Sequence, residues 1–316
     1  MHRRFLLAAA GAALSALPFA RARATGALPP GVPIITVGFA AGGIGDALAR
    51  LVAEAARARR NTQVIVENRP GGGGSIATDR VARLAPDGLN IVLGSPGALL
   101  VLPHQIQLGY DPVAGLTPLG QLVSQPLPVY VRADSPLRDW AGALAFARAS
   151  PGQFSWGTAG ARSFAEIVVE AALRQEGLDT TSVPFRGGAE AIQALLGGHV
   201  MAVASTDYGP LLQQGAVRLL AETGPIPVPG QPQVPTFQAL GYPLCFPVGY
   251  GFLGPAGLAP AALAWWESLL AEVAGTPAMQ DFARRYLGVA AYEDGTGYGR
   301  IIREGFTAIG DALRKA

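Results

Sequence analysis

The stretch IITVGFAAGGIGDALAR, residues 34–50, joins an apolar run to a glycine-rich turn and then to a helical pattern. The apolar run at residues 34–38 favours a strand, and the spacing of apolar residues from 46 to 60 favours a helix. The turn between them contains Gly42, Gly43 and Gly45. Such a turn directs backbone N–H groups and the positive end of the helix dipole at an anion. The stretch therefore predicts an α/β fold with an anion site in its first turn.

The next fifty residues continue the alternation of strand and helix. The predicted elements are a strand at 63–67, a helix at 75–84 that follows the glycine run 71–74, and a strand at 90–95. This βαβαβ order predicts parallel strands with helices covering the faces of the sheet.

A second series of the same kind follows a proline-rich crossing at residues 125–136. Its predicted elements are helices at 139–149, 163–176 and 189–196 and strands at 154–157, 181–184, 200–204 and 217–221. Two α/β lobes, each built on a parallel-rich sheet flanked by helices, are therefore expected rather than one sheet.

The last part of the chain predicts a return to the first lobe. A proline-dense tract at 225–235 and an apolar segment at 246–253 fit a return path, and helices are expected at 261–274, 277–287 and 298–314. The expected domains are residues 25–124 together with 244–316, and residues 125–243. Two crossings between lobes imply a hinged cleft, and ligands bind in such clefts beyond the carboxyl ends of strands.

The N-terminus has the pattern of an export signal. MHRR is basic, FLLAAAGAALSALPFA is apolar, and Ala22-Arg23-Ala24 is an A-x-A cleavage site. Residues 1–24 are therefore expected to be a signal peptide, by a Sec or a Tat route, and the mature protein is expected in the periplasm.

Charge and cysteine content exclude several kinds of partner. Removing the four arginines of residues 1–24 from the 24 basic residues leaves 20 against 22 acidic residues, so no nucleic-acid-binding surface is expected. Cys245 is the single cysteine, and His104 and His199 are the histidines outside the signal. This composition predicts neither a metal site nor a bound cofactor.

The glycine-rich turn does not match a nucleotide-binding motif. The dinucleotide fingerprint G-x-G-x-x-G requires a third glycine where the chain has Leu48, although Glu67 stands where a ribose-binding acid is expected. A P-loop requires a lysine after the glycines, and Lys315 is the single lysine of the chain. The turn therefore favours an anion other than a nucleotide phosphate.

Enzymatic motifs are equally weak. Ser95 in LGSPG lacks the glycine spacing of a nucleophile elbow, and the carboxylates at Asp87, Asp111, Asp134 and Asp139 lie in turns or at helix starts, where aspartate caps the backbone. Three anion-friendly turns remain: residues 42–45, 95–97 and 157–160. Helix N-termini hold a carboxylate without arginine or lysine, so these turns favour a small carboxylate ligand over catalysis.

An ordered set of motifs resembles one receptor family. FAAGGIGDALAR, VIVENRPGGGGSIATDRVARLAPDG, YDP at 110–112, VPFRGGAEAIQALLGGHV, VPTFQALG and GFLGPAGLAP follow one another along the chain. Together they resemble the Bug (TctC-like) solute receptors of tripartite tricarboxylate transporters. The resemblance implies a type II-like periplasmic binding protein fold, whose two domains close on a small organic acid and deliver it to membrane permease subunits.

The resemblance also implies where the ligand binds. In the family the ligand carboxylate is held by backbone amides and hydroxyls of the loop after the first strand and of the loop that opens the main helix of the second domain. The implied ligand-binding residues are Phe39, Ala40, Gly42, Gly43, Ile44, Gly45 and Asp46 in the first loop, Thr158, Ala159, Gly160, Arg162 and Ser163 in the second, and Ser95, Phe185, Thr206 and Asp207 as further walls.

The chain departs from the family pattern near the implied cleft. Gly45 stands where relatives often carry a hydroxyl residue, Phe164-Ala165 stands near a common histidine, and Phe185 replaces a tyrosine. These changes remove polar groups, which favours a less polar or aromatic acid over a tricarboxylate. Two alternatives stay open: an exported receptor that presents its ligand to a membrane sensor, and an exported enzyme that uses the glycine loop. The receptor is expected to be a monomer.

Overall fold

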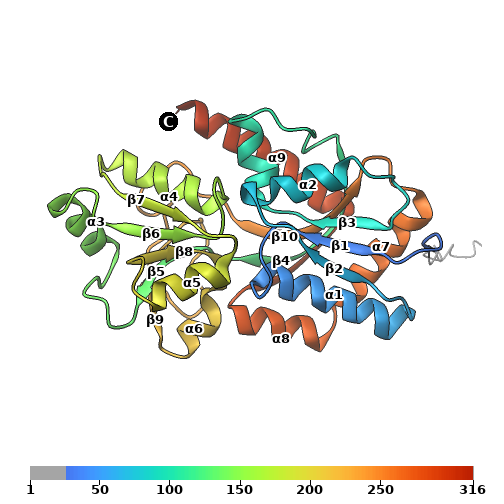
Figure 1. Ribbon diagram of the computed structural model, residues 1–316, viewed down its shortest axis with the longest axis horizontal. Coiled ribbons are helices and arrows are strands. Elements are labelled where there is room, and N and C mark those ends of the chain that lie inside the picture. The colour runs from blue at the N-terminus through green and yellow to red at the C-terminus, as the bar shows by residue number, and fades with distance from the viewer. Residues whose placement is uncertain (1–25, 316) are drawn as a thin grey trace, which may run out of the picture.

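The computed structural model describes residues 26–315, so the expected signal peptide lies outside the described residues. Two lobes lie side by side, each with a central sheet and helices on both faces (Figure 1). None of the helices in the described part of the chain is long and apolar enough to cross a membrane.

The first lobe is built on a six-stranded sheet in the order β11-β4-β10-β3-β1-β2. Its strands are β1 (Ile34–Val37), β2 (Ile65–Asn68), β3 (Asn90–Leu93), β4 (Leu116–Gln125), β10 (Val248–Pro255) and β11 (Val289–Asp294). Strand β1 pairs in parallel with β2 and β3, whereas β10 and β11 pair antiparallel with β4. The helices are α1 (Ile44–Arg60), α2 (Ser75–Ala82), α7 (Pro260–Ala274), α8 (Pro277–Tyr286) and α9 (Gly295–Lys315).

The second lobe is built on a five-stranded sheet in the order β7-β6-β8-β5-β9. Its strands are β5 (Pro128–Arg132), β6 (Ser155–Thr158), β7 (Thr181–Pro184), β8 (Ala202–Ala204) and β9 (Val217–Glu222). Its helices are α3 (Trp140–Ala149), α4 (Phe164–Gln175), α5 (Gly188–Leu196) and α6 (Gly209–Gln213). In Figure 1, α4 lies on one side of this sheet and α5 and α6 lie on the other.

The predicted fold class is confirmed, with a difference in the pairing of the strands. Both sheets are mixed: β6 pairs in parallel with β7 and β8, but β5 pairs antiparallel with β8 and β9. The crossing expected at 125–136 contains β5, and the return segment at 246–253 is largely β10. Strand β5 begins with Pro128, and a proline is tolerated at the first residue of a strand. Strand β5 was therefore not predicted, because its segment is rich in proline.

The chain passes between the lobes after β4 and again before β10, because β5 to β9 all belong to the second sheet. Parallel strands place their carboxyl ends at one edge of a sheet. The loops after β1 and β3 in one lobe and after β6 and β8 in the other thus share one interface. The exact boundaries at residues 124/125 and 243/244 stay a prediction.

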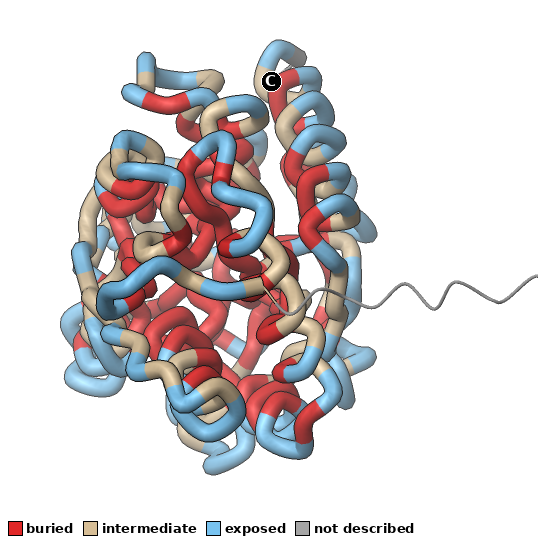
Figure 2. The backbone as a smooth tube through the Cα atoms, turned by 90° about the vertical axis from the view of Figure 1, so that its right-hand side faces the viewer, coloured by how far each residue is buried: buried red, intermediate tan, exposed pale blue. Residues whose placement is uncertain are grey.

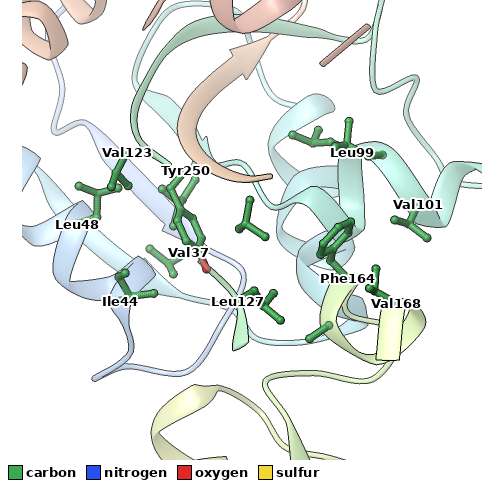
Figure 3. Packing of buried hydrophobic residues seen from close by; sticks show 14 of the residues in the cluster. Val37, Ile44, Leu48, Leu99, Val101, Val123, Leu127, Phe164, Val168 and Tyr250 are labelled. Atoms are coloured by element: carbon green, nitrogen blue, oxygen red, sulfur yellow. The ribbon is translucent and has the colours of Figure 1, made fainter. Parts of the chain in front are cut away.

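The hydrophobic core continues across this interface. Buried residues fill the interior of the molecule, and exposed ones lie on the outer helix surfaces (Figure 2). Phe164 and Val168 of α4 belong to the same buried cluster as Leu99 and Val101 of the first lobe and lie close to them in Figure 3. The two lobes are therefore in contact, as in the closed form of a hinged protein.

Candidate functional site

A cavity of about 50 Å³ lies between the lobes, with room for a few water-sized groups. It is lined by Phe39, Gly73, Ser95, Pro96, Gly97, Leu127, Ala159, Ser163, Phe164, Ala165, Ala204, Ser205, Thr206, Val248 and Tyr250. Hollows of about 480 to 820 Å³ lie elsewhere on the molecule. We select the small cavity because the loops after β1, β3, β6 and β8 meet there, at the carboxyl ends of parallel strands.

The N-terminus of helix α4 lies at this cavity. Ser163 is the N-cap residue, and its hydroxyl accepts a hydrogen bond from the backbone N–H of Glu166 at 3.3 Å. The N–H groups of Phe164 and Ala165 lie in the first turn, where the helix has no carbonyl to pair them. A Cβ at Gly97 would lie 3.0 Å from the nitrogen of Phe164, so the absence of a side chain keeps the space before this N–H open. The α4 N-terminus can therefore hold an anion in the cavity.

Ser95 lies in the loop that follows β3 and is held by the glycine run 71–74 and by its own loop. Its hydroxyl donates to the carbonyl of Gly73 at 2.6 Å and accepts from the N–H of Ala98 at 3.3 Å. Gly73 has a φ of 57°, and a Cβ there would lie 2.8 Å from the carbonyl oxygen of Arg162. Only glycine therefore allows the run 71–74 to approach the second lobe this closely.

Hydroxyl groups from both lobes line the opposite wall. A hydrogen bond of 2.8 Å connects the hydroxyls of Thr206 and Tyr250, which belong to different lobes. A second hydrogen bond of 2.8 Å connects the hydroxyls of Ser205 and Tyr130 within the second lobe. Burial raises the pKa of Tyr250 far above its usual range, so this hydroxyl stays protonated. The wall offers neutral hydrogen-bonding groups, and no charged residue is among the described residues that line the cavity.

The first loop makes its hydrogen bonds within the chain. The N–H of Ala40 donates to the carbonyl of Arg186 in the second lobe at 2.9 Å. The N–H of Gly42 donates to the carboxylate of Asp46 at 3.1 Å, and that carboxylate also accepts two bonds of 2.9 Å from Arg50. Burial raises the pKa of Asp46, but the bonds from Arg50 and Gly42 outweigh this effect and hold it below the usual range. Asp46 is thus an ionised group that orders the loop.

The N-terminus of α1 is bound by a carboxylate of the second lobe. The N–H of Ile44 donates to Asp207 Oδ1 at 2.6 Å, and α1 has no side-chain cap of its own at Gly43. Asp207 is 9% exposed, and burial raises its pKa to about 6 although the bond from Ile44 acts in the opposite direction. Asp207 therefore binds the N–H of Ile44, one of the donors of the anion site predicted in the glycine turn.

The structure brings part of the predicted site together at the cavity. Phe39, Ser95, Ala159, Ser163 and Thr206 line it. The other predicted residues do not line the cavity. The first loop and the start of α1 contain Ala40, Gly42, Gly43, Ile44, Gly45 and Asp46. A hydrogen bond joins Thr158 to Gly160, Phe185 packs on Gly157, and Asp207 binds Ile44, whereas Arg162 is exposed beside a separate hollow.

Several lining residues were not predicted from the sequence. They include Leu127 and Val248, which flank the crossings, and Tyr250 of β10. No local pattern distinguishes these residues, because the cavity is formed from segments far apart in the sequence. Gly73 had a signal in the run 71–74, but the run was interpreted only as a helix start. Within residues 26–315 no group of three or more His, Cys, Asp or Glu residues could hold a metal ion.

The sequence of residues 48–313 matches the model of the tripartite tricarboxylate transporter family receptor, TctC. The chain belongs to this family. The "UPF0065 protein in gbd 5'region" of Cupriavidus necator is 34% identical to this TctC receptor over 267 residues, which are 82% of this chain and 81% of the relative.

Two solved structures share the fold of this TctC receptor. The periplasmic binding protein BugD has a TM-score of 0.81 at 25% identity, with 91% of this chain and 98% of BugD covered. MatC from Rhodopseudomonas palustris, solved with bound malate, has a TM-score of 0.81 at 23% identity, with 89% and 98% covered. The family is one of transporter receptors and BugD is a periplasmic binding protein, so the chain is a substrate-binding receptor and the hypothesis of an enzyme that uses the glycine loop is set aside.

Proposed function

We propose that this TctC receptor captures a small organic carboxylate in the cavity between its lobes. The observation that carries the proposal is the position of the α4 N-terminus at the cavity, with the first-turn N–H groups of Phe164 and Ala165 unpaired by the helix. The hydroxyls of Thr206 and Tyr250 supply a further donor for an acid, because the hydrogen bond between them uses only one of their two protons. A malate-bound neighbour with the same fold supports this class of ligand.

Closure of the lobes encloses the ligand. The hydrogen bonds that join the lobes around the cavity include Ala40 to Arg186, Ile44 to Asp207, and Thr206 to Tyr250. An open form would expose the α4 N-terminus to solvent, and a ligand that binds the closed form better shifts the population towards it. The bound acid then contacts both lobes at once.

The transport role extends this proposal. A signal peptide at residues 1–24 would export the chain to the periplasm, where the closed receptor would deliver its acid to the permease subunits of a tripartite tricarboxylate transporter. Presentation of the acid to a membrane sensor is the alternative partner. Native mass spectrometry of a pull-down with a co-expressed permease distinguishes the two, because a sensor system yields no receptor–permease complex.

Gly97→Ala tests the position of the ligand. Its methyl group would lie 3.0 Å from the nitrogen of Phe164, in the space where the carboxylate is expected. We expect affinity for the best acid of a mono-, di- and tricarboxylate panel to fall by at least about tenfold, since a charge-assisted hydrogen bond is lost. Isothermal titration calorimetry measures the affinity, and circular dichroism checks that the fold is retained.

Gly275→Ala is the matched control, because a Cβ at Gly275 would meet only the carbonyl of Glu272 at 3.8 Å and lies after α7. Unchanged affinity in Gly97→Ala would place the ligand elsewhere. A wild-type protein that shows no thermal stabilisation by any acid of the panel would contradict the proposed function itself.

A further inference from the structure

We infer that Asp207 acts as a built-in anion that occupies the N-terminus of α1, leaves that of α4 for the ligand, and thereby selects ligands with a single carboxylate and an apolar body. The inference rests on the proposed function of the cavity as an acid-binding site. It concerns which acids this chain accepts.

The carboxylate of Asp207 lies between the N-termini of α1 and α5. Its Oδ1 accepts the N–H of Ile44 at 2.6 Å, across 163 positions of sequence, and a Cβ at Gly43 would lie 3.2 Å from the same oxygen. Its Oδ2 lies against the first residue of α5, because a Cβ on Gly188 would overlap this oxygen. The N-termini of α1, with 17 residues, and of α5, with 9, both present partial positive charge to one side chain.

The charge of Asp207 is not cancelled by a basic side chain. Among the described residues the ion pairs include one between Asp46 and Arg50 but none that involves Asp207. A second ligand carboxylate directed at α1 would therefore meet a negative charge without an intervening cation. If it instead displaced Asp207, it would leave that carboxylate buried without its partner, which is also unfavourable.

Two further N–H groups of the first loop are already paired within the chain. The N–H groups of Ala40 and Gly42 are already bound by Arg186 and Asp46. Gly45 is packed against β3, since a Cβ there would lie 2.8 Å from a methyl carbon of Leu93. The loop is therefore a structural part of the closed interface.

The α4 N-terminus remains as the place for one carboxylate. Around it the cavity is lined mainly by apolar groups, including Phe39, Leu127, Phe164 and Val248. A volume of about 50 Å³ has room for a carboxylate group, so the body of a longer acid requires the lobes to part slightly around it. The geometry thus points to a short monocarboxylate whose body packs on these side chains while its carboxylate faces α4.

Length-matched pairs of acids test the inference. Isothermal titration calorimetry at pH 7.5 compares butyrate with succinate and hexanoate with adipate on the wild-type protein and on Asp207→Asn. The asparagine keeps an oxygen for the N–H of Ile44 but removes the charge. We expect the wild type to prefer the monocarboxylate of each pair by at least about tenfold, and Asp207→Asn to reduce that preference by at least about tenfold.

Asp134→Asn is the matched control, because it removes the same charge from a side chain of the second lobe that is 70% exposed and does not line the cavity. Its preference should equal that of the wild type. A wild-type preference for the dicarboxylates would overturn the inference and leave the proposed function intact, and this comparison decides even if Asp207→Asn fails to fold. Absence of binding by every acid would overturn the proposed function and the inference with it.

Discussion

The side chain of Asp207 binds a backbone N–H at the helix start where the glycine turn predicts an anion site. The glycine turn at 42–45 was correctly expected at a helix start, but its N–H at Ile44 is bound by a residue 163 positions away. Sequence periodicity describes contacts within an element and carries no information on contacts between distant turns. Asp207 was predicted as a wall of the site, whereas its contact with α1 could be seen only in the folded chain.

Gly188→Ala is expected to destabilise the protein through Asp207. The added methyl group would overlap Asp207 Oδ2, and overpacking of this kind costs about 1–3 kcal/mol. Urea unfolding should show this loss, and Asp207→Ser should recover much of it in the double variant because the shorter side chain vacates the space. Additive effects of the two substitutions would contradict the contact.

Two buried carboxyl groups predict the pH dependence of stability. Burial raises the pKa of Asp207 to about 6 and that of Glu222 to about 8, although the N–H groups of Leu127 and Gly224 partly offset the shift at Glu222. The folded state therefore binds more protons than the unfolded state between about pH 4 and pH 8. Stability should fall as pH rises through this window, by on the order of a few kcal/mol.

Urea unfolding at pH 5 and pH 8 measures this difference. Glu222→Gln should flatten the dependence, because glutamine still accepts the N–H groups of Leu127 and Gly224 but binds no proton in this range. Greater stability at pH 8 than at pH 5 would contradict the raised pKa values.

At the scale of elements, the sequence predicted those with strong periodicity and missed those defined by pairing. Helix α1 was expected at 46–60 and spans Ile44–Arg60, because its apolar residues recur on one face. Strand β4 was missed because LTPLGQLVSQ contains Pro118 and Gly120, and β11 because its residues are mostly half-buried or exposed. Both strands are fixed by antiparallel pairing with partners distant in sequence.

The same contrast applies to the elements of the site. The start of α4 was predicted closely, since Ser163 is an N-cap residue with an acidic Glu166 three positions later. The residues Leu127, Val248 and Tyr250 come from crossings and from β10, and they reach the cavity only because the lobes come together. The turn residues of the sequence could locate the wall formed by the start of α4, whereas the wall formed by Leu127, Val248 and Tyr250 depends on how the lobes come together.

At the scale of the molecule, the closed form is held by polar contacts around an apolar interface. Phe164 and Val168 pack with Leu99 and Val101 in one continuous core, and the bonds of Ala40, Ile44 and Thr206 lie around it. The buried carboxylate of Asp207 binds the N-terminus of α1 at this interface. Closure therefore leaves one helix N-terminus, that of α4, for a bound acid.

A crystal structure of the receptor with the tightest-binding acid of the panel tests this arrangement most directly. We predict a single ligand carboxylate within about 3 Å of the backbone nitrogens of Phe164 and Ala165, with Asp207 still bound to Ile44. An acid bound outside the cavity, or one whose carboxylate has replaced Asp207 at the N–H of Ile44, would contradict it.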